Sequence, residues 1–351
     1  MRVETILLSV DTEQYAGMGH KLTSIAEIAA SARTLERLGF DGVTTPEAGS
    51  DPFLPLMVAA EHTKRIHLGT NVAIAFPRSP MVVAQIAWDL QRYSGGRFQL
   101  GLGTQVKGHN ERRYSTPWTA PAGPRLREYI LCLKAMFETF QTGKRPSFEG
   151  QHYRFTLMSP FFSPGPIEHS HVPIYLAVVN KYMARLAGEL CDGLRLHPFA
   201  SFKHTHEVIL PAVEEGCRKA GRALSAVDIV GSPFLAVGRD AEGVAAAKAA
   251  VKQRIAFYAS TRTYHSVLQC HGWTETGLKL HQMSLEGKWL EMGSLISDEM
   301  LEEFAIVGTY DDFPATLKKR CGGAFSTILL DLPADLREDE PRVAAIVQAL
   351  R

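Results

Sequence analysis

Short, almost continuously apolar runs alternate along the chain with longer segments in which apolar residues recur every three or four positions. Short apolar runs bounded by turn residues are typical of buried parallel strands, and the longer spacing is typical of amphipathic helices. In segment 23–40, Ile25 and Ile28 begin such a helical face, and Ser24 and Glu27 have the spacing of a capping box. The pattern therefore predicts alternating strands and helices.

Eight such strands can be counted, and all but the fourth are followed directly by a predicted helix. The predicted strands cover residues 3–10, 41–45, 65–75, 97–103, 173–179, 193–199, 227–238 and 326–332. The predicted helices include residues 23–40, 51–63, 79–96, 180–191, 201–220, 241–259, 312–320 and 342–351. Eight βα units favour a closed (β/α)8 TIM barrel, in the α/β class, over an open doubly wound sheet, although counting alone leaves the open sheet as the alternative.

Two segments interrupt this rhythm. Residues 142–172, after the fourth strand, are rich in Pro, Phe and His, and residues 260–305, after the seventh, have mixed helical patterning. We interpret both as insertions on one barrel domain spanning 1–351. Loops after strand ends build the active site of a barrel, so the aromatic insertions are either pocket walls or packed surface excursions.

Composition and charge exclude several classes of function. The 38 Lys and Arg nearly balance the 37 Asp and Glu, which argues against a nucleic-acid partner. The five cysteines form no C-x-x-C pair, and no uncharged apolar stretch approaches the ~20 residues of a membrane span. We expect a soluble, cytoplasmic protein that acts on a small molecule and has no membrane partner.

Several polar residues come directly after predicted strands, where a barrel places its active site. Asn71 interrupts the third strand, so it is either a hydrogen-bonded core residue or a ligand-facing strand end. Glu47 and His197 follow the second and sixth strands, where each could act as acid or base. Gly101 and Gly103 would allow a close backbone approach, although a lone G-x-G is a weak signal.

Beyond the fourth strand lies a polar, net basic cluster at residues 107–113, which contains His109 and Asn110. This cluster is either a solvated face or a site for an anionic cofactor group. Asn180 stands at a predicted helix N-cap, where capping suffices as an explanation and phosphate binding is the alternative. No metal-binding spacing is present, and we expect a cofactor enzyme without a metal.

These segments resemble the bacterial luciferase-like superfamily, and within it the coenzyme F420-dependent oxidoreductase branch. The resemblance is carried by 69–118, which contains "GTNVAIAFPRSP" and "FQLGLGTQVKGHNERR", by 176–199 and by 307–320. It implies a barrel that is usually a homodimer, with a flavin or deazaflavin at the carboxyl ends of the strands. It implies hydride transfer through F420 to or from a small organic substrate, and the aromatic insertion "YRFTLMSPFFSP" suggests that this substrate is partly apolar.

The resemblance also implies which residues would contact the cofactor. A cis peptide bond between Asn71 and Val72 would lie behind the central ring, and Glu47 would contact that ring. The remaining cofactor contacts would be Gly103, Thr104, His109 or Asn110, Val179 and Asn180. Catalytic candidates are Glu47, His109 and His197.

The chain also departs from one relative, a sugar-phosphate dehydrogenase. That enzyme has a histidine and a catalytic glutamate at positions that read Ala48 and Val106 here, so its substrate does not transfer. Two alternatives stay open: an FMN-dependent monooxygenase and a barrel that binds a flavin or deazaflavin without turnover. The basic residues Lys107, Arg112, Arg113, Arg125 and Arg127 suit the oligoglutamate tail of F420, which FMN lacks.

Overall fold

The computed structural model describes residues 1–7 and 24–351, and eight parallel strands in it close into a barrel. The sheet runs in the order β3-β2-β1-β13-β10-β9-β8-β5-β4, and β3 also pairs with β5, which closes the ring. The ring strands are β1 (Arg2–Ile6), β2 (Gly42–Thr45), β3 (His67–Thr70), β5 (Phe98–Gly103), β8 (Ile174–Val178), β9 (Gly193–Leu196), β10 (Asp228–Gly231) and β13 (Thr327–Leu330). The predicted (β/α)8 barrel is confirmed, and the predicted end of the first strand, residues 8–10, lies outside the described residues.

Helices surround this ring in the order that the pattern predicts. They are α1 (Ile25–Arg37), α2 (Leu54–His62), α3 (Pro80–Tyr93), α6 (Lys181–Leu190), α8 (Leu210–Lys219), α9 (Ala241–Ala259), α13 (Phe313–Cys321), α14 (Ala334–Arg337) and α15 (Glu340–Leu350). The capping box at Ser24 and Glu27 forms as expected, because each side chain bonds the other residue's backbone N–H. The predicted helix at 201–220 is one rod of α7 (Phe202–His204), a π-helical turn η2 (Thr205–Ile209) and α8.

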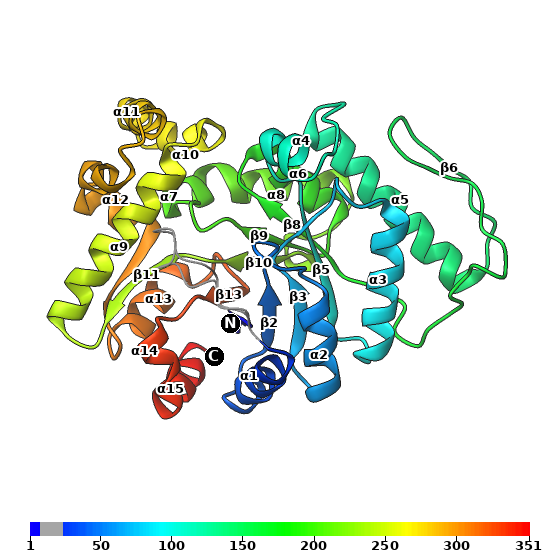
Figure 1. Cartoon of the computed structure of the whole chain (residues 1–351), viewed down its shortest axis with the longest axis horizontal. Coiled ribbons are helices and arrows are strands. Elements are labelled where there is room, and N and C mark those ends of the chain that lie inside the picture. The colour runs from blue at the N-terminus through cyan, green and yellow to red at the C-terminus, as the bar shows by residue number, and fades with distance from the viewer. Residues whose placement is uncertain (8–23) are drawn as a thin grey trace.

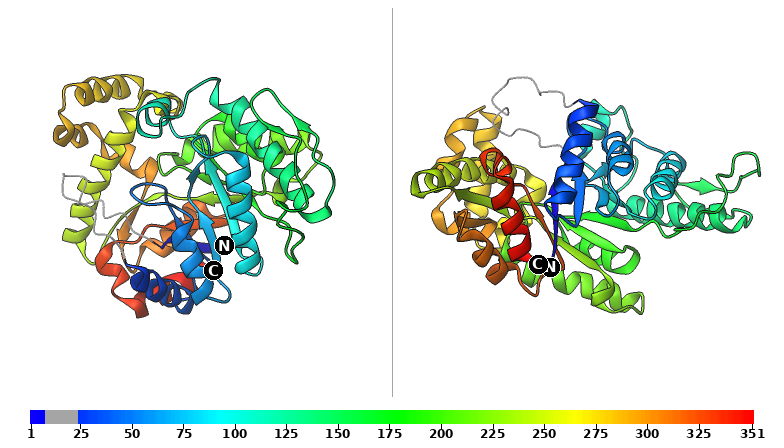
Figure 2. Two further views of the ribbon diagram at one scale, coloured as in Figure 1. Left: turned by 45° about the vertical axis from the view of Figure 1, so that its right-hand side comes forward. Right: turned by 90° about the horizontal axis from the view of Figure 1, so that it is seen from below.

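The first insertion extends away from the barrel as a hairpin, which Figure 2 shows in its right-hand view. It consists of β6 (Phe148–Glu149) and β7 (Arg154–Phe155), preceded by the 21-residue helix α5 (Ala122–Thr142). The segment that follows β7 is held to α3, because Trp88 Nε1 donates to the Gly165 carbonyl at 3.0 Å. The sequence pattern did not single out α5.

The second insertion packs its own small apolar core against α9. It contains η4 (Arg262–Tyr264), α10 (His265–Cys270), α11 (Thr274–Leu285), η5 (Trp289–Leu295) and α12 (Asp298–Phe304). It ends in β12 (Ala305–Thr309), which pairs in parallel with β11 (Phe234–Gly238), and this two-stranded sheet was not predicted. The insertion is therefore held to the barrel by its apolar core against α9 and, at its carboxyl end, by this strand pair.

The carboxyl ends of the strands open on the side where both α10 and the short helix α4 (Lys107–Arg113) lie, as the arrow of β2 in Figure 1 indicates. We call this end the mouth of the barrel. The two chain termini lie close together in Figure 2, near the amino ends of β1 and β13 and so at the opposite end. Segments that follow strands β2, β5, β8 and β9 meet at the mouth. Because barrel enzymes carry their active sites at this end, we expect the functional site there.

Candidate functional site

Partly exposed residues mark the mouth, although the strands behind them are almost wholly buried. Val72, Ala177 and Val179 are partly exposed, whereas their strand neighbours Leu102 and Leu176 are completely buried. Asn71 and Thr104 are also partly exposed. The accessible part of this side of the mouth is therefore a largely apolar platform bordered by an amide and a hydroxyl, which suits a flat ring system.

The platform is built around the peptide bond between Asn71 and Val72, which is cis, as the resemblance implied. It separates β3 from the two-residue strand β4 (Ala73–Ile74), which pairs with the end of β5. A Cβ on Gly103 would lie 2.7 Å from Val72 Cγ2, and one on Gly101 would lie 2.0 Å from the Thr70 carbonyl oxygen. The G-x-G motif thus makes room for the chain at 70–72, a close approach of protein to protein.

Glu47, which follows β2, is held by three different donors. Its Oε2 accepts the Ile74 N–H at 2.7 Å, and Arg78 Nη1 donates to both carboxylate oxygens at 2.9 and 2.7 Å. The Tyr114 hydroxyl donates to Oε1 at 3.0 Å, and the Glu47 side chain is only 5% exposed. The carboxylate therefore ties together β4, the segment before α3 and the residue after α4.

Charge complementarity stabilises this arrangement. Burial would lower the pKa of Arg78, but its hydrogen bonds and charge interactions with Glu47 and Asp51 outweigh that effect, so the pKa is raised. Burial and the neighbouring Glu47 both raise the pKa of Tyr114. Arg78 stays charged and Tyr114 stays protonated near neutral pH, which are the states that Glu47 needs in its partners.

Asn110 is completely buried beneath the loop that follows β5. Its Nδ2 donates to the carbonyls of Thr104, at 2.9 Å, and Val106, at 3.2 Å, and so holds a loop in which Gln105 has a left-handed φ of 54°. Asn110 Oδ1 has no partner among the described residues. His109, next in the chain, is exposed on α4. Of the two residues, Asn110 is the one that shapes the mouth.

The other predicted strand ends are found where expected. Asn180 caps α6, because its side-chain oxygen accepts the Met183 N–H at 3.0 Å, which leaves its capping role sufficient on its own. Within the basic cluster, Lys107, Arg112 and Arg113 are exposed on α4. Of the further basic residues, Arg125 lies over the Phe76 ring and Arg127 forms a 2.8 Å ion pair with Glu189. Of these five basic residues, the three exposed ones therefore all lie on α4.

A polar layer closes the barrel beneath the mouth. Arg195 Nη1 lies 2.7 Å from Glu4 Oε2, both side chains are 3% exposed, and Arg195 Nη2 donates to Gln99 Oε1 at 3.2 Å. Gly42 and Gly69 leave the space that these long side chains occupy, because a Cβ at either position would come within 3 Å of Glu4 or Arg195. The sequence analysis did not identify this floor, since its members lie on five different strands.

His197 lies above this floor. It follows β9, where Leu194 and Leu196 pack in the outer core and Arg195 points inward, so alternation turns His197 toward the mouth. Burial, followed by the charge of Arg254, lowers its pKa to about 4. His197 is therefore neutral at pH 7.

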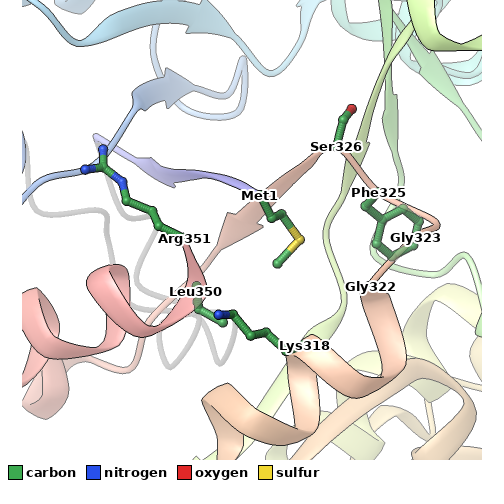
Figure 3. Close-up of a pocket in the computed structure, with 8 residues that line it drawn as sticks. All are labelled: Met1, Lys318, Gly322, Gly323, Phe325, Ser326, Leu350 and Arg351. Atoms are coloured by element: carbon green, nitrogen blue, oxygen red, sulfur yellow. The ribbon is translucent and has the colours of Figure 1, made fainter.

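A separate cavity lies at the opposite end of the barrel. It has a volume of about 490 Å³ and is bordered by Met1, Lys318 and Arg351 together with the loop before β13, as Figure 3 shows. None of the predicted site residues borders it. Catalytic groups of barrels gather at the carboxyl ends of the strands, so we do not assign the site to this cavity.

Neither a metal centre nor a membrane span is found in the described part of the chain. No group of three or more His, Cys, Asp and Glu residues there could hold a metal ion. No helix in that part is long and apolar enough to cross a bilayer.

The structure thus brings together most of the predicted site and adds residues that were missed. Glu47, Asn71, Val72, Thr104 and Val179 all border the mouth, while the predicted site did not include Arg78 and Tyr114, the partners of Glu47. Arg78 stands in the conspicuous loop "FPRSP", where an arginine between two prolines could have suggested a buried ion pair. Tyr264, beside His197, also escaped notice because it lies in the second insertion.

The fold and the mouth define a (β/α)8 barrel with a site at the carboxyl ends of its strands, and the relatives of the chain place it among enzymes of the oxidoreductase class. Residues 2–320 match the model of the luciferase-like monooxygenase family, and the chain belongs to that family.

Three known proteins show how the chain relates to others. An uncharacterized protein of Mycobacterium tuberculosis is 45% identical over 305 residues, which are 87% of this chain and 89% of the relative. An F420-dependent glucose-6-phosphate dehydrogenase of Nocardia farcinica is 31% identical over 216 residues, 58% of this chain and 62% of the relative. The structure of a coenzyme F420-dependent tetrahydromethanopterin reductase from Methanopyrus kandleri superposes with a TM-score of 0.75 at 21% identity, covering 93% of this chain and 95% of that one.

Proposed function

We propose that this protein is a coenzyme F420-dependent oxidoreductase that transfers a hydride between the deazaflavin and a small, partly apolar organic substrate. The observation that carries the proposal is the apolar platform of Val72, Ala177 and Val179 at the mouth, with the cationic helix α4 beside it. A flat ring fits the platform, and an anionic tail fits the cations. The name of the Nocardia relative, which states F420 dependence, supports the same cofactor.

The residues that would hold the cofactor fall into three groups. Asn71, Val72 and Val179 would contact the ring, and Glu47 would fix the shape of the ring site through Ile74 and Arg78. Gly103, Thr104, His109, Asn110 and Asn180 complete the proposed set. The buried Asn110 Oδ1 has no hydrogen-bond partner among the described residues, so it is the acceptor in this set that a donor of the cofactor would use.

When bound, the deazaflavin supplies two-electron hydride chemistry, because it carries carbon where a flavin has its reactive nitrogen. The protein supplies orientation and proton handling. Since three donors engage Glu47, we propose that it positions the site and that proton transfer falls to another residue.

A homodimer forms part of the proposal. Large apolar side chains are exposed on the neighbouring helices α2 and α3, where Leu54 is 71%, Val82 47% and Tyr93 61% exposed. Such a surface is typical of a subunit interface. Sedimentation velocity should give twice the mass of the 38.7 kDa chain, and a monomer at micromolar concentration would remove this part of the proposal.

Fluorescence titration of the purified protein with F420 and with FMN tests the cofactor assignment. We expect saturable binding of F420 and much weaker binding of FMN. Tight binding of FMN without binding of F420 would favour an FMN-dependent monooxygenase, in keeping with the family description. Binding of F420 without hydride transfer to any substrate would indicate a protein that only binds the cofactor.

A further inference from the structure

Three aromatic side chains form a wall on the side of the mouth next to β9 and α9. The His197 ring lies 4.7 Å from the Tyr258 ring and 4.9 Å from the Tyr264 ring, and the two tyrosine rings are 6.1 Å apart. All three residues are partly exposed. We call His197, Tyr258 and Tyr264 the aromatic wall. It adjoins the cofactor platform at the end of β8, where the His197 N–H donates to the Val178 carbonyl at 3.2 Å, but it shares no residue with the platform. No role has been given so far to its tyrosines.

The hydrogen bonds of His197 fix which nitrogen carries its proton. The Phe199 N–H donates to His197 Nδ1 at 3.0 Å, so Nδ1 is an acceptor. Because the pKa of His197 is lowered to about 4, the ring is neutral at pH 7 and carries one proton. That proton is therefore on Nε2, which lies 3.5 Å from the Tyr264 hydroxyl oxygen.

This arrangement determines the direction of the Tyr264 hydroxyl. If Nε2–H of His197 donates to the Tyr264 oxygen, the tyrosine proton points away from His197. Among residues 1–7 and 24–351, no acceptor takes that proton. Burial, and then the neighbouring Tyr258, raise the pKa of Tyr264 to about 12, so the hydroxyl is protonated at neutral pH.

We propose that Tyr264 is the catalytic proton donor and acceptor for the substrate, that His197 is the residue that positions it, and that the substrate is a neutral carbonyl compound or the corresponding alcohol. This inference rests on the proposed F420-dependent hydride transfer. In reduction, the carbonyl carbon gains the hydride, the π electrons of the C=O bond move to oxygen, and that oxygen takes the proton of the Tyr264 hydroxyl. The cofactor is oxidised, the substrate is reduced, and solvent returns a proton to the phenolate, which His197 Nε2–H stabilises meanwhile.

The charges around the wall favour a neutral carbonyl over a cationic acceptor such as an iminium ion. The wall itself is uncharged, and Arg254 is close enough to His197 to lower its pKa. Arg254 in turn lies 3.6 Å from Asp331, which Arg337 also binds at 2.8 Å, so one carboxylate is shared by two cations and these three groups are net positive. Neither His197 nor Tyr264 has a carboxylate among its contacts with the described residues. The oxygen of a neutral carbonyl gains negative charge during reduction and needs a proton donor. The Tyr264 hydroxyl of the wall is such a donor.

The test compares Tyr264→Phe with Tyr258→Phe, a matched loss of one hydroxyl from the same wall. Each is assayed with reduced F420 and with cyclohexanone or acetophenone as the probe, following the absorbance of the oxidised cofactor. For Tyr264→Phe we expect kcat to fall about 100-fold or more while KM stays within about threefold, since general acid catalysis contributes about 10²–10⁴. The solvent deuterium isotope effect on kcat should differ between the wild type and Tyr264→Phe, and kcat should fall far less in Tyr258→Phe than in Tyr264→Phe.

A second readout needs neither cofactor nor substrate. Nitrogen-15 NMR of the unliganded protein should show His197 protonated at Nε2, and the Nε2 proton should shift in Tyr264→Phe but hardly in Tyr258→Phe. Protonation at Nδ1 would overturn the positioning role. Melting temperatures of both variants should stay close to that of the wild type, because both rings are kept.

The outcomes separate this inference from the proposed function. Equal kcat in Tyr264→Phe and the wild type, or equal losses in both variants, would overturn the role of Tyr264. A wild type that binds F420 but reduces neither ketone would overturn the carbonyl assignment and leave the cofactor assignment standing. A wild type that does not bind F420 would remove the proposed function itself.

Discussion

The two sides of the barrel mouth are built in opposite ways. On the side of β2 to β5, Glu47 is locked by Ile74, Arg78 and Tyr114 through charge-assisted hydrogen bonds. On the side of β9 and α9, the aromatic wall is neutral and consists of rings in contact, with one long hydrogen bond of 3.5 Å. On the first side, a polar hydrogen-bond network supports an apolar platform. On the second side, the contacts are between rings, and the polar groups are the hydroxyls of Tyr258 and Tyr264.

This difference matches the different demands of a cofactor and a substrate. A fully satisfied polar network fixes one geometry, which suits a cofactor that is the same in every turnover. The insertion contributes Tyr264 to the wall, and an insertion can change without disturbing the barrel, which suits a substrate that differs between relatives. The contrast predicts that substitutions on the first side affect stability and cofactor binding, and that substitutions on the second affect turnover.

The largest effect is expected for Gly101→Ala, beneath the platform. The new Cβ would lie 2.0 Å from the Thr70 carbonyl oxygen, a backbone atom that cannot move without shifting the Asn71–Val72 segment. We expect a loss of about 3 kcal/mol or more in the free energy of unfolding. The control Gly243→Ala, with no atom closer than 3.4 Å, should lie within about 1 kcal/mol of the wild type in urea denaturation. Similar stabilities for both variants would contradict the close packing of the platform.

A smaller loss is expected for Glu47→Gln, which keeps the shape but removes the charge. The amide turns an NH2 group toward donors, so Arg78 loses one of its two acceptor oxygens and either the Ile74 N–H or the Tyr114 hydroxyl loses its acceptor. We expect about 2–3 kcal/mol less stability and at least tenfold weaker F420 binding. Asp51→Asn removes the more exposed partner of the same arginine and should cost less than about 1 kcal/mol. Full retention of F420 binding in Glu47→Gln would show that the network is not needed.

The aromatic wall should affect the pH dependence of the unfolding free energy through His197. The pKa of His197 is about 4 in the folded protein and higher when unfolded, so between pH 6.5 and 4 the unfolded chain takes up a proton that the folded chain does not. Stability due to this residue is complete above that window and falls as the pH drops through it, by up to about 1.4 kcal/mol per pH unit. His197→Gln should flatten the curve relative to the wild type, while His204, with its pKa also near 4, contributes equally to both. Parallel curves would show that His197 is not held neutral.

The smallest effect is expected for the paired change Lys107→Ala and Arg112→Ala on α4. Both side chains are exposed, so the unfolding free energy should change by less than about 0.5 kcal/mol. Affinity for F420 should fall about threefold to tenfold at low salt, and the difference should shrink as salt is added. The control ligand is a deazaflavin without the glutamate tail, whose affinity should not change. An equal loss for both ligands would place the tail elsewhere.

The sequence predicts the fold well because the barrel is a repeat of local patterns. Continuous apolar runs and three-to-four spacing are properties of neighbouring residues, and eight repeats in a row leave few topologies. β12 escaped prediction because its five residues follow a helical insertion and pair with β11, about 70 residues earlier.

The site was predictable only in part, since its bonds join distant residues. Glu47 could be placed at a strand end from the sequence. Its partner Tyr114 follows a different strand, and no local sequence pattern indicates that the two residues are in contact. The motif at Gly101 and Gly103 correctly signalled a close approach, although the approaching group is the chain at Thr70 and Val72. The cis bond at Asn71 was expected only from the resemblance, because no periodicity indicates it.

A crystal structure of the protein with oxidised F420 tests the two-sided mouth most directly. We predict that one face of the deazaflavin ring rests on Val72 and Ala177, and that the other face is open toward the Tyr264 hydroxyl with room for a small ketone between them. A ring that stacks on the aromatic wall itself, or that binds away from the platform, would contradict the account.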